Sequence, residues 1–255
     1  MEAMLALSHV CFSYHTVGGE TLALTDITFS VGFGEFAVIV GPSGCGKSTL
    51  LSLICGLIRP ESGEIRRTGR RTDTASRGIG YMLQKDHLFE WRSVYDNVLL
   101  GLEIQKKLTQ PNLDRVNRML ETYGLSAFAQ MKPSALSGGM KQRAALIRTL
   151  ALDPDLLLLD EPFSALDYQT RLEVSDDIGS IIRREKKTAI LVTHDLSEAI
   201  SMADRVIILS RRPGAVKRIL PISFPEEYDT PLKKRNSQEF SHYFNLIWKE
   251  LKTYG

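Results

Sequence analysis

A glycine-rich segment, lying between an apolar run and a helical pattern, constrains this chain most. Phe36–Val40 is continuously apolar, as expected of a parallel strand covered on both faces. It leads directly into Gly41-Pro-Ser-Gly-Cys-Gly-Lys-Ser48, which fits the pattern G-x-x-x-x-G-K-[ST]. Apolar residues then recur at helical spacing up to a glycine stop: Leu50, Leu51, Ile54 and Leu57, with the stop at Gly56. The sequence therefore predicts a strand, a phosphate-binding loop and a helix in that order.

The predicted loop has the chemistry needed to hold a nucleotide. Glycines allow backbone N–H groups to converge on phosphates, and the following helix N-terminus adds a partial positive charge. We expect Lys47 to reach the β and γ phosphates of ATP and the Ser48 hydroxyl to bind Mg²⁺. The alternative is a glycine-rich turn with an incidental lysine. The predicted ATP-binding residues of this segment are Gly41, Pro42, Ser43, Gly44, Cys45, Gly46, Lys47, Ser48 and Thr49.

A second apolar run ends in two acidic residues. Leu156–Leu159 is followed by Asp160-Glu161-Pro162. Phosphoryl transfer requires a further magnesium ligand and a group that positions the attacking water. We therefore assign Asp160 to Mg²⁺ and Glu161 to the water, as general base or orienting acceptor. The alternative is an ordinary solvated strand end.

A third motif, Leu136-Ser-Gly-Gly-Met-Lys-Gln-Arg143, makes the chain resemble the ATP-binding cassette subunits of membrane transporters. The resemblance implies that Ser137, Gly138 and Gly139 bind the γ phosphate of ATP held by a partner subunit. ATP is then enclosed between two cassettes arranged head to tail. A hydroxyl and exposed N–H groups at a helix start suit an anion. The alternative is a glycine turn that only caps a helix.

Four more residues match the family. Tyr14 resembles the aromatic residue that stacks on adenine, and Gln84 the catalytic glutamine that contacts Mg²⁺ and water. Asp167, in Ser164-Ala-Leu-Asp167, resembles the residue that communicates across the dimer interface in trans. His194 resembles the catalytic histidine that senses the γ phosphate. Tyr14 as a simple core aromatic, and His194 as a structural residue at a strand exit, remain alternatives.

The hydrophobic pattern predicts the architecture around these motifs. Ile27, Phe29 and Val31 alternate with Thr28 and Ser30, as in a half-buried antiparallel strand. From Ser93 the pattern is helical, with Ser93 and Asp96 spaced as a capping box. The other elements are expected from a helical stripe (Val116, Met119, Leu120, Tyr123), a buried strand (Ala189–Val192), two helix caps (Asp195–Glu198, Asn236–Glu239) and a hairpin (Val206–Leu209, turning at Pro213 and Gly214).

The fold class predicted is α/β, a P-loop NTPase core with a mixed sheet, an N-terminal antiparallel β subdomain and an inserted α-helical subdomain. We expect one ATP-binding domain over residues 1–255. Its catalytic core is predicted at about 1–86 and 151–220, and the helical subdomain at about 87–150. A C-terminal extension of about 221–255 ends in an amphipathic helix, which either packs on its own domain or docks elsewhere.

Composition narrows the partners. The 255 residues are 43% hydrophobic, and 32 basic against 30 acidic residues leave a net charge of +2. This balance favours neither nucleic acid nor an anionic surface as a general partner. Cys11, Cys45 and Cys55 suggest no disulfide framework or zinc site, and Cys45 is interpreted as structural rather than redox-active. No signal peptide and no membrane-spanning run is recognised.

The segment Lys85–Val94 refines the resemblance. It is similar to the segment that, in importers of the nitrate, sulfonate and taurine group, receives the coupling helix of the permease. Leu88, Phe89, Trp91 and Arg92 are carried over as permease contacts. Glu90 departs from the proline that relatives usually have.

The resemblance implies an ATP-hydrolysing importer subunit on the cytoplasmic face of the membrane, with ATP and Mg²⁺ bound. Its partners would be a second copy or a paralogous cassette, membrane permease subunits and, indirectly, a solute-binding protein. The competing interpretation is a soluble cassette ATPase of DNA repair or translation. The transported solute cannot be derived, because the cassette does not contact it.

Overall fold

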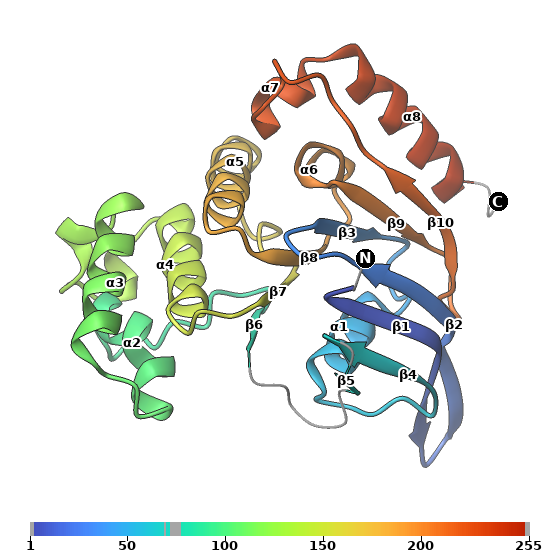
Figure 1. Cartoon of the computed structure of the whole chain (residues 1–255), viewed down its shortest axis with the longest axis horizontal. Coiled ribbons are helices and arrows are strands. Elements are labelled where there is room, and N and C mark those ends of the chain that lie inside the picture. The colour runs from blue at the N-terminus through green and yellow to red at the C-terminus, as the bar shows by residue number, and fades with distance from the viewer. Residues whose placement is uncertain (1–2, 69, 72–77, 253–255) are drawn as a thin grey trace. The chain divides into compact units, whose positions relative to one another are not determined.

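The computed structural model describes residues 3–68, 70–71 and 78–252 of a chain that forms two compact units (Figure 1). The first unit comprises Met1–Arg77 and Gly179–Gly255, and the second comprises Gly78–Ile178. Helix α5, Tyr168–Arg184, leads from the second unit into the first.

The first unit contains an antiparallel sheet of order β2-β1-β4-β5. Its strands are β1 (Leu5–Thr16), β2 (Gly19–Val31), β4 (Ser62–Arg67) and β5 (Arg70–Arg71). In β2, Ile27, Phe29 and Val31 are buried, whereas Thr28 and Ser30 face solvent. The predicted alternation, and with it the N-terminal antiparallel subdomain, is confirmed.

The same unit contains the predicted buried strands. Strand β3 (Phe36–Val40) lies between β8 (Thr188–Val192) and β9 (Arg205–Leu209) and runs parallel to both. All residues of β3 and β8 are buried, which explains their unbroken apolar sequence. Strand β10 (Val216–Pro221) pairs antiparallel with β9, as the predicted hairpin requires.

Local signals explain where the helices of the first unit begin and end. Helix α1, Lys47–Cys55, ends at Gly56, whose left-handed φ of 76° allows its N–H to reach the carbonyls of Leu53 and Ser52. Asp195 caps α6, Leu196–Met202, through the N–H groups of its first turn. Both signals were predicted from the sequence and are confirmed.

The predicted cap at Asn236 is wrong by one residue. Asn236 ends helix α7, Pro231–Arg235, and the Ser237 hydroxyl accepts the Phe240 N–H at the start of α8, Gln238–Lys252. Serine is as good a cap as asparagine, so spacing alone could not choose between them. Helix α8 lies beside β10, where Glu250 accepts hydrogen bonds from Arg218 (Figure 1).

The second unit combines two parallel strands with helices. Strands β6 (Ile79–Met82) and β7 (Leu156–Asp160) pair in parallel. The elements between them are α2 (Val94–Ile104), α3 (Gln110–Thr122), the 3-10 turns η1 (Ser126–Phe128) and η2 (Pro133–Ala135), and α4 (Gly138–Leu150). Ser93 caps α2 by accepting the Asp96 N–H at 3.0 Å, as predicted. The predicted stripe of α3 is buried.

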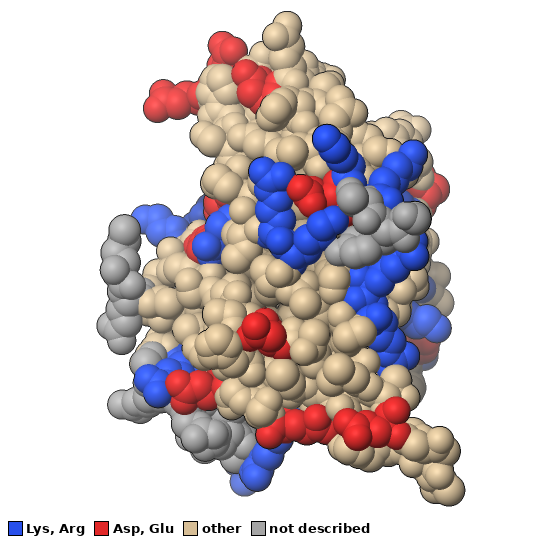
Figure 2. Space-filling model, turned by 90° about the vertical axis from the view of Figure 1, so that its right-hand side faces the viewer, with Lys and Arg blue, Asp and Glu red and all other residues tan. Residues whose placement is uncertain are grey.

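The predicted helical subdomain, about 87–150, falls within the second unit, which also contains β6 and β7. The limits of the core and of the C-terminal extension remain a prediction, and residues 1–2, 69, 72–77 and 253–255 of those ranges lie outside the described residues. Among the described residues, the helices lack the length and apolar character needed to cross a membrane. Basic and acidic side chains occur together on the face shown in Figure 2.

Candidate functional site

The loop after β3 owes its conformation to glycines. Gly44 and Gly46 have φ values of 76° and 100°, a region that residues with a Cβ rarely adopt. A Cβ on Gly46 would lie 2.6 Å from Leu24 Cδ2, and one on Gly41 would lie 2.8 Å from Cys45 Sγ. Backbone conformation therefore favours glycine at position 44, sterics favour it at position 41, and both favour it at position 46.

Lys47 is held inside this loop. Its side chain is only 7% exposed, and its Nζ donates to the carbonyl oxygens of Gly41 at 2.9 Å and Pro42 at 3.1 Å. A buried ammonium group is costly unless it is bonded, so the loop closes around the lysine. An ammonium group has three N–H donors, and these bonds account for two of them. The geometry holds a fixed positive charge within a ring of backbone groups.

Cys45 is part of the packing of the loop. It is buried, and desolvation raises the pKa of its thiol, although Lys47 acts in the opposite direction. A thiol that is buried and neutral is a poor nucleophile. This agrees with the structural interpretation of Cys45 and removes the basis for a redox role.

Tyr14, at the end of β1, is 43% exposed and is therefore not a core residue. Its hydroxyl hydrogen-bonds the Thr49 hydroxyl at 2.9 Å, which ties β1 to the first turn of α1. Ser48 lies in that same turn. His194 is exposed and stands between the end of β8 and the Asp195 cap of α6. The first unit thus holds the loop, Tyr14 and His194.

The second unit holds the predicted catalytic acids. Asp160 ends β7 and is buried, and the Tyr81 hydroxyl donates to it at 3.3 Å. Glu161 follows with a left-handed φ of 44°. This conformation is unusual outside glycine and strains the backbone at the point where the strand ends.

Gln84 and Glu161 are connected through Ser164. The Gln84 Nε2 donates to Ser164 Oγ at 3.3 Å, and Ser164 Oγ donates to the Glu161 carbonyl at 2.9 Å. The structure therefore brings Gln84 close to the segment that follows β7. Glu161, the first residue of that segment, is 77 positions after Gln84 in the sequence. The role of Ser164 in this chain was not recognised from the sequence, because a serine in a loop has no distinctive pattern.

The glycine-rich segment before α4 is built differently. Ser137 caps α4 by accepting the Met140 N–H at 3.3 Å, and Ser137 and Gly138 are both exposed. A Cβ on Gly139 would lie 2.7 Å from Val174 Cγ2. A Cβ on Gly138 would lie 2.9 Å from Leu166 Cδ2, so packing favours glycine at both positions. The exposed hydroxyl and helix start are accessible to an anion.

Asp167 caps α5. It accepts the Thr170 N–H at 3.1 Å, and this backbone hydrogen bond is the main reason that the pKa of Asp167 is lowered. The residue is exposed. Its position is compatible with both helix capping and contact with a partner.

The segment predicted to contact a permease exposes one large aromatic residue. Trp91 is 73% exposed and stacks on Phe89, with ring centroids 4.6 Å apart. Leu88 is buried beneath the segment, and Arg92 is paired with Glu103 of α2 at 2.6 Å. Of the four predicted contact residues, Trp91 is the most accessible.

Two residues that sequence reasoning missed hold this segment in place. The buried Asn97 of α2 bonds both the N–H and the carbonyl of Phe89, at 2.7 and 3.0 Å. Arg148 of α4 donates to the carbonyls of His87 and Asp86 at 2.7 and 2.6 Å. An amide on the apolar stripe of a helix, beside Val94 and Val98, was the signal available for Asn97.

A parallel strand, a glycine loop closed around a buried lysine and a helix starting at that loop define a P-loop nucleotide-binding protein. The family model described as "ABC transporter" matches residues 24–164. The chain belongs to the ABC transporter family, as its ATP-binding subunit, and it is an ATPase.

Individual relatives agree with this assignment. The chain is 45% identical to "Uncharacterized ABC transporter ATP-binding protein YtlC" of Bacillus subtilis, over 98% of this chain and 96% of that protein. It is 41% identical to "Nitrate import ATP-binding protein NrtD" of Synechocystis, over 90% of this chain and 88% of that protein. Among solved structures, the dimeric post-hydrolysis state of the cassette MJ0796 bound to ADP and Pi matches with a TM-score of 0.73 and 30% identity, over 87% of this chain and all of that one.

Proposed function

We propose that this ATPase powers an importer: two cassettes close head to tail on ATP, hydrolysis reopens them, and the motion passes to a separate membrane permease. The chain then works on the cytoplasmic face of the membrane. Its second cassette is another copy or a paralogue, and a solute-binding protein acts further upstream. We propose that the cassette consists of the catalytic core, the helical subdomain and the C-terminal extension predicted from the sequence.

The observation that carries the proposal is the buried Lys47. Its ammonium group is held by hydrogen bonds to the carbonyls of Gly41 and Pro42. Such a preorganised charge stabilises the negative charge that develops on transferring phosphoryl oxygens. We assign the ATP phosphates to Gly41–Thr49 and the adenine ring to Tyr14, whose exposed face is available for stacking.

The donors assigned to Mg²⁺ fit that ion. Ser48 offers a hydroxyl, Asp160 a carboxylate and Gln84 an amide carbonyl, and Mg²⁺ prefers such oxygen ligands. When bound, Mg²⁺ neutralises charge on the phosphate oxygens.

Glu161 is proposed to orient and deprotonate the attacking water. Its backbone carbonyl is tied through Ser164 to Gln84, so that acid and amide belong to one bonded segment. His194, exposed at the exit of β8, is proposed to sense the γ phosphate. Both act as positioning or proton-accepting groups for the same step.

The face opposite the γ phosphate is proposed to come from the second cassette. Ser137, Gly138 and Gly139 would supply a hydroxyl and helix N–H groups in trans, with Asp167 nearby at the interface. Exposure of Ser137 and Gly138 supports this assignment. The solved relative is likewise described as dimeric.

Trp91 and Phe89 are proposed to anchor a helix of the permease, with Leu88 and Arg92 completing the contact. An exposed tryptophan that stacks on a half-buried phenylalanine, as Trp91 does on Phe89, is a typical binding anchor. The solute is proposed to be small, of the nitrate, sulfonate or taurine kind. A relative named as a nitrate import ATP-binding protein supports that class.

The Glu161→Gln variant tests the proposal. We expect hydrolysis to fall by about 10²–10⁴-fold, the usual contribution of a general base. ATP and Mg²⁺ should then trap a dimer, measured by light scattering after size exclusion. Glu173→Gln, an exposed glutamate of α5, is the matched control and should leave turnover unchanged. Unaltered hydrolysis in Glu161→Gln would show that another group prepares the water.

A second experiment separates transport from the competing role in DNA repair or translation. Affinity purification of the tagged chain from its own membranes should recover hydrophobic permease subunits. Recovery of ribosomes or DNA without any membrane protein would contradict the transport role. Ligand screening of the copurified solute-binding protein would identify the solute.

A further inference from the structure

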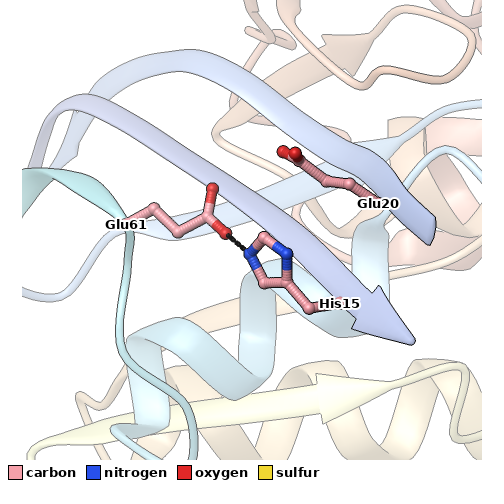
Figure 3. Close-up of side chains that lie close together, drawn as sticks. All are labelled: His15, Glu20 and Glu61. Carbon is pink, nitrogen blue, oxygen red and sulfur yellow. Dashed lines mark hydrogen bonds and ion pairs between the residues drawn. The ribbon is translucent and has the colours of Figure 1, made fainter. Parts of the chain in front are cut away.

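Three metal-ligating side chains converge on the antiparallel sheet of the first unit (Figure 3). His15 is the penultimate residue of β1, Glu20 is the second residue of β2, and the two are directly paired across the strands. Glu61 precedes β4, and its backbone N–H is held by the Cys11 carbonyl of β1 at 3.0 Å. The β1–β2 hairpin therefore places His15 beside Glu20, and the contact of Glu61 with β1 adds a carboxylate from a distant part of the sequence.

Their ligand atoms are already close. His15 Nε2 lies 2.6 Å from Glu61 Oε1, and one ligand atom from each of the three residues lies within 4.8 Å of the others. In a tetrahedral zinc site, bonds of about 2.1 Å place neighbouring ligand atoms about 3.4 Å apart. All three residues are exposed, so rotation of their side chains can bring the ligand atoms to this spacing.

The charge of the cluster suits a cation. The Glu61 carboxylate lies against the imidazole, with His15 Nε2 at 2.6 Å from Glu61 Oε1. Among the residues that the structure describes, Glu20 forms no ion pair that would compensate its carboxylate. Two carboxylates facing one imidazole leave a local excess of negative charge when the imidazole is neutral.

Ser13 is a buried polar residue of β1 next to this cluster. It lies two residues before His15, in a stretch of β1 with regular pairing, so the two side chains share a face. Ser13 is 2% exposed, and its Oγ has no hydrogen bond of ordinary geometry with a described residue. It can orient a ligating carboxylate or a metal-bound water.

We propose that His15, Glu20 and Glu61 form a binding site for a divalent transition metal, with Zn²⁺ as the best-suited ion. An imidazole nitrogen with carboxylate oxygens suits zinc, whereas Mg²⁺ and Ca²⁺ prefer sites made of oxygen alone. The fourth position would be taken by water. The site is separate from the phosphate loop and does not depend on the transport role.

A similar pair elsewhere on the same sheet provides a matched control. His9 Nδ1 lies 2.7 Å from Asp26 Oδ1, and both residues are exposed. The pair has the same chemistry as His15 and Glu61, but no third ligand group joins it among the described residues. A metal that needs three ligands should therefore distinguish the two pairs.

The test is calorimetric titration of the EDTA-treated full chain with zinc chloride. We expect one equivalent to bind with a dissociation constant on the order of micromolar. Glu20→Gln should weaken binding at least about tenfold, and His15→Ala should weaken it further. His9→Ala should bind as the unaltered protein does. Zinc should also raise the melting temperature of the unaltered protein but not that of Glu20→Gln.

Glu20 is a suitable position because its removal breaks no ion pair with any residue that the structure describes, so the fold is expected to survive. The melting temperature in EDTA checks this. Cobalt(II) spectra then distinguish the ligands, because a thiolate from Cys11 would add a strong charge-transfer band that nitrogen and oxygen ligands lack. Absence of saturable binding, unchanged affinity in Glu20→Gln, or a thiolate band would each overturn the proposal.

Discussion

Two glycine-rich segments start helices in this chain, and they are built in opposite ways. The loop at Gly41–Thr49 is closed on itself around a buried lysine. The segment at Ser137–Gly139 is open, with a serine cap and an exposed glycine. The first has its positive charge in place, whereas the second offers only a hydroxyl and helix N–H groups. This difference fits our proposal that the first segment is the primary nucleotide site and that the second completes the site of another subunit.

Of the variants that test this difference, Lys47→Ala should lose the most activity. We expect hydrolysis to fall by about 10³-fold and ATP affinity to drop, because the preorganised charge is lost. A coupled ATPase assay and a fluorescent nucleotide titration measure both. Lys141→Ala is the matched control, since Lys141 follows the open segment and pairs with Glu90 at 3.7 Å. Equal losses in the two variants would remove the distinction between the segments.

Ser137→Asp tests whether the open segment faces an anion. Aspartate caps helices as well as serine does, so stability should change little. Its negative charge should repel the γ phosphate and lower hydrolysis by about 10²-fold. Nucleotide binding to the isolated monomer should persist. Ser137→Asn, which caps the helix without charge, should retain much more activity. If both variants hydrolyse ATP equally, Ser137 serves the helix alone.

Gly46→Ala tests the closed loop through stability. The new Cβ would combine a strained φ with a close approach to Leu24, so we expect a loss of about 2–4 kcal/mol in the free energy of unfolding. Gly44→Ala has a positive φ but an open surrounding, and it should lose only about 1 kcal/mol. Urea denaturation of both variants compares the cost of backbone strain alone, in Gly44→Ala, with the cost of strain plus a steric clash, in Gly46→Ala. A larger loss in Gly44→Ala would contradict the packing argument.

Cys45→Ser should have the smallest effect. Because backbone N–H groups and Lys47 form the proposed phosphate site, hydrolysis should stay within about threefold of the original. Thiol labelling at neutral pH gives the complementary measurement. Cys11, whose pKa is lowered chiefly by a backbone hydrogen bond from Asp26, should react faster than the buried Cys45, whose pKa is raised. Faster labelling of Cys45 would reopen a redox role for the loop.

Much of the fold was predictable because its signals are local. The unbroken apolar run of β3 and the alternation in β2 follow directly from which faces are covered. The caps at Ser93 and Asp195 depend on spacings of a few residues. The cap of α8 was missed by one residue, because Asn236 and Ser237 are both good caps and only the chain path chooses between them.

The site was predictable as far as motifs extend. Lys47, Asp160 and Ser137 were located by their patterns, and their assigned roles remain proposals. The supporting contacts had no such signal: Asn97 and Arg148 hold Phe89 and His87 through backbone groups, which any residue possesses. The sequence also did not show which apolar side chains of this segment are exposed: Leu88 is buried, whereas Trp91 is exposed.

The sequence by itself determined the strand, loop and helix, the residue types that can bind phosphate and the family, because these depend on short spacings and on side-chain chemistry. Only the tertiary structure decided that Lys47 is enclosed, that Glu161 and Gln84 are joined through Ser164, and that Ser137 stays open. Likewise, only strand pairing brought His15, Glu20 and Glu61 together. Contacts between residues distant in sequence arise from packing of the whole chain, and no local pattern encodes them.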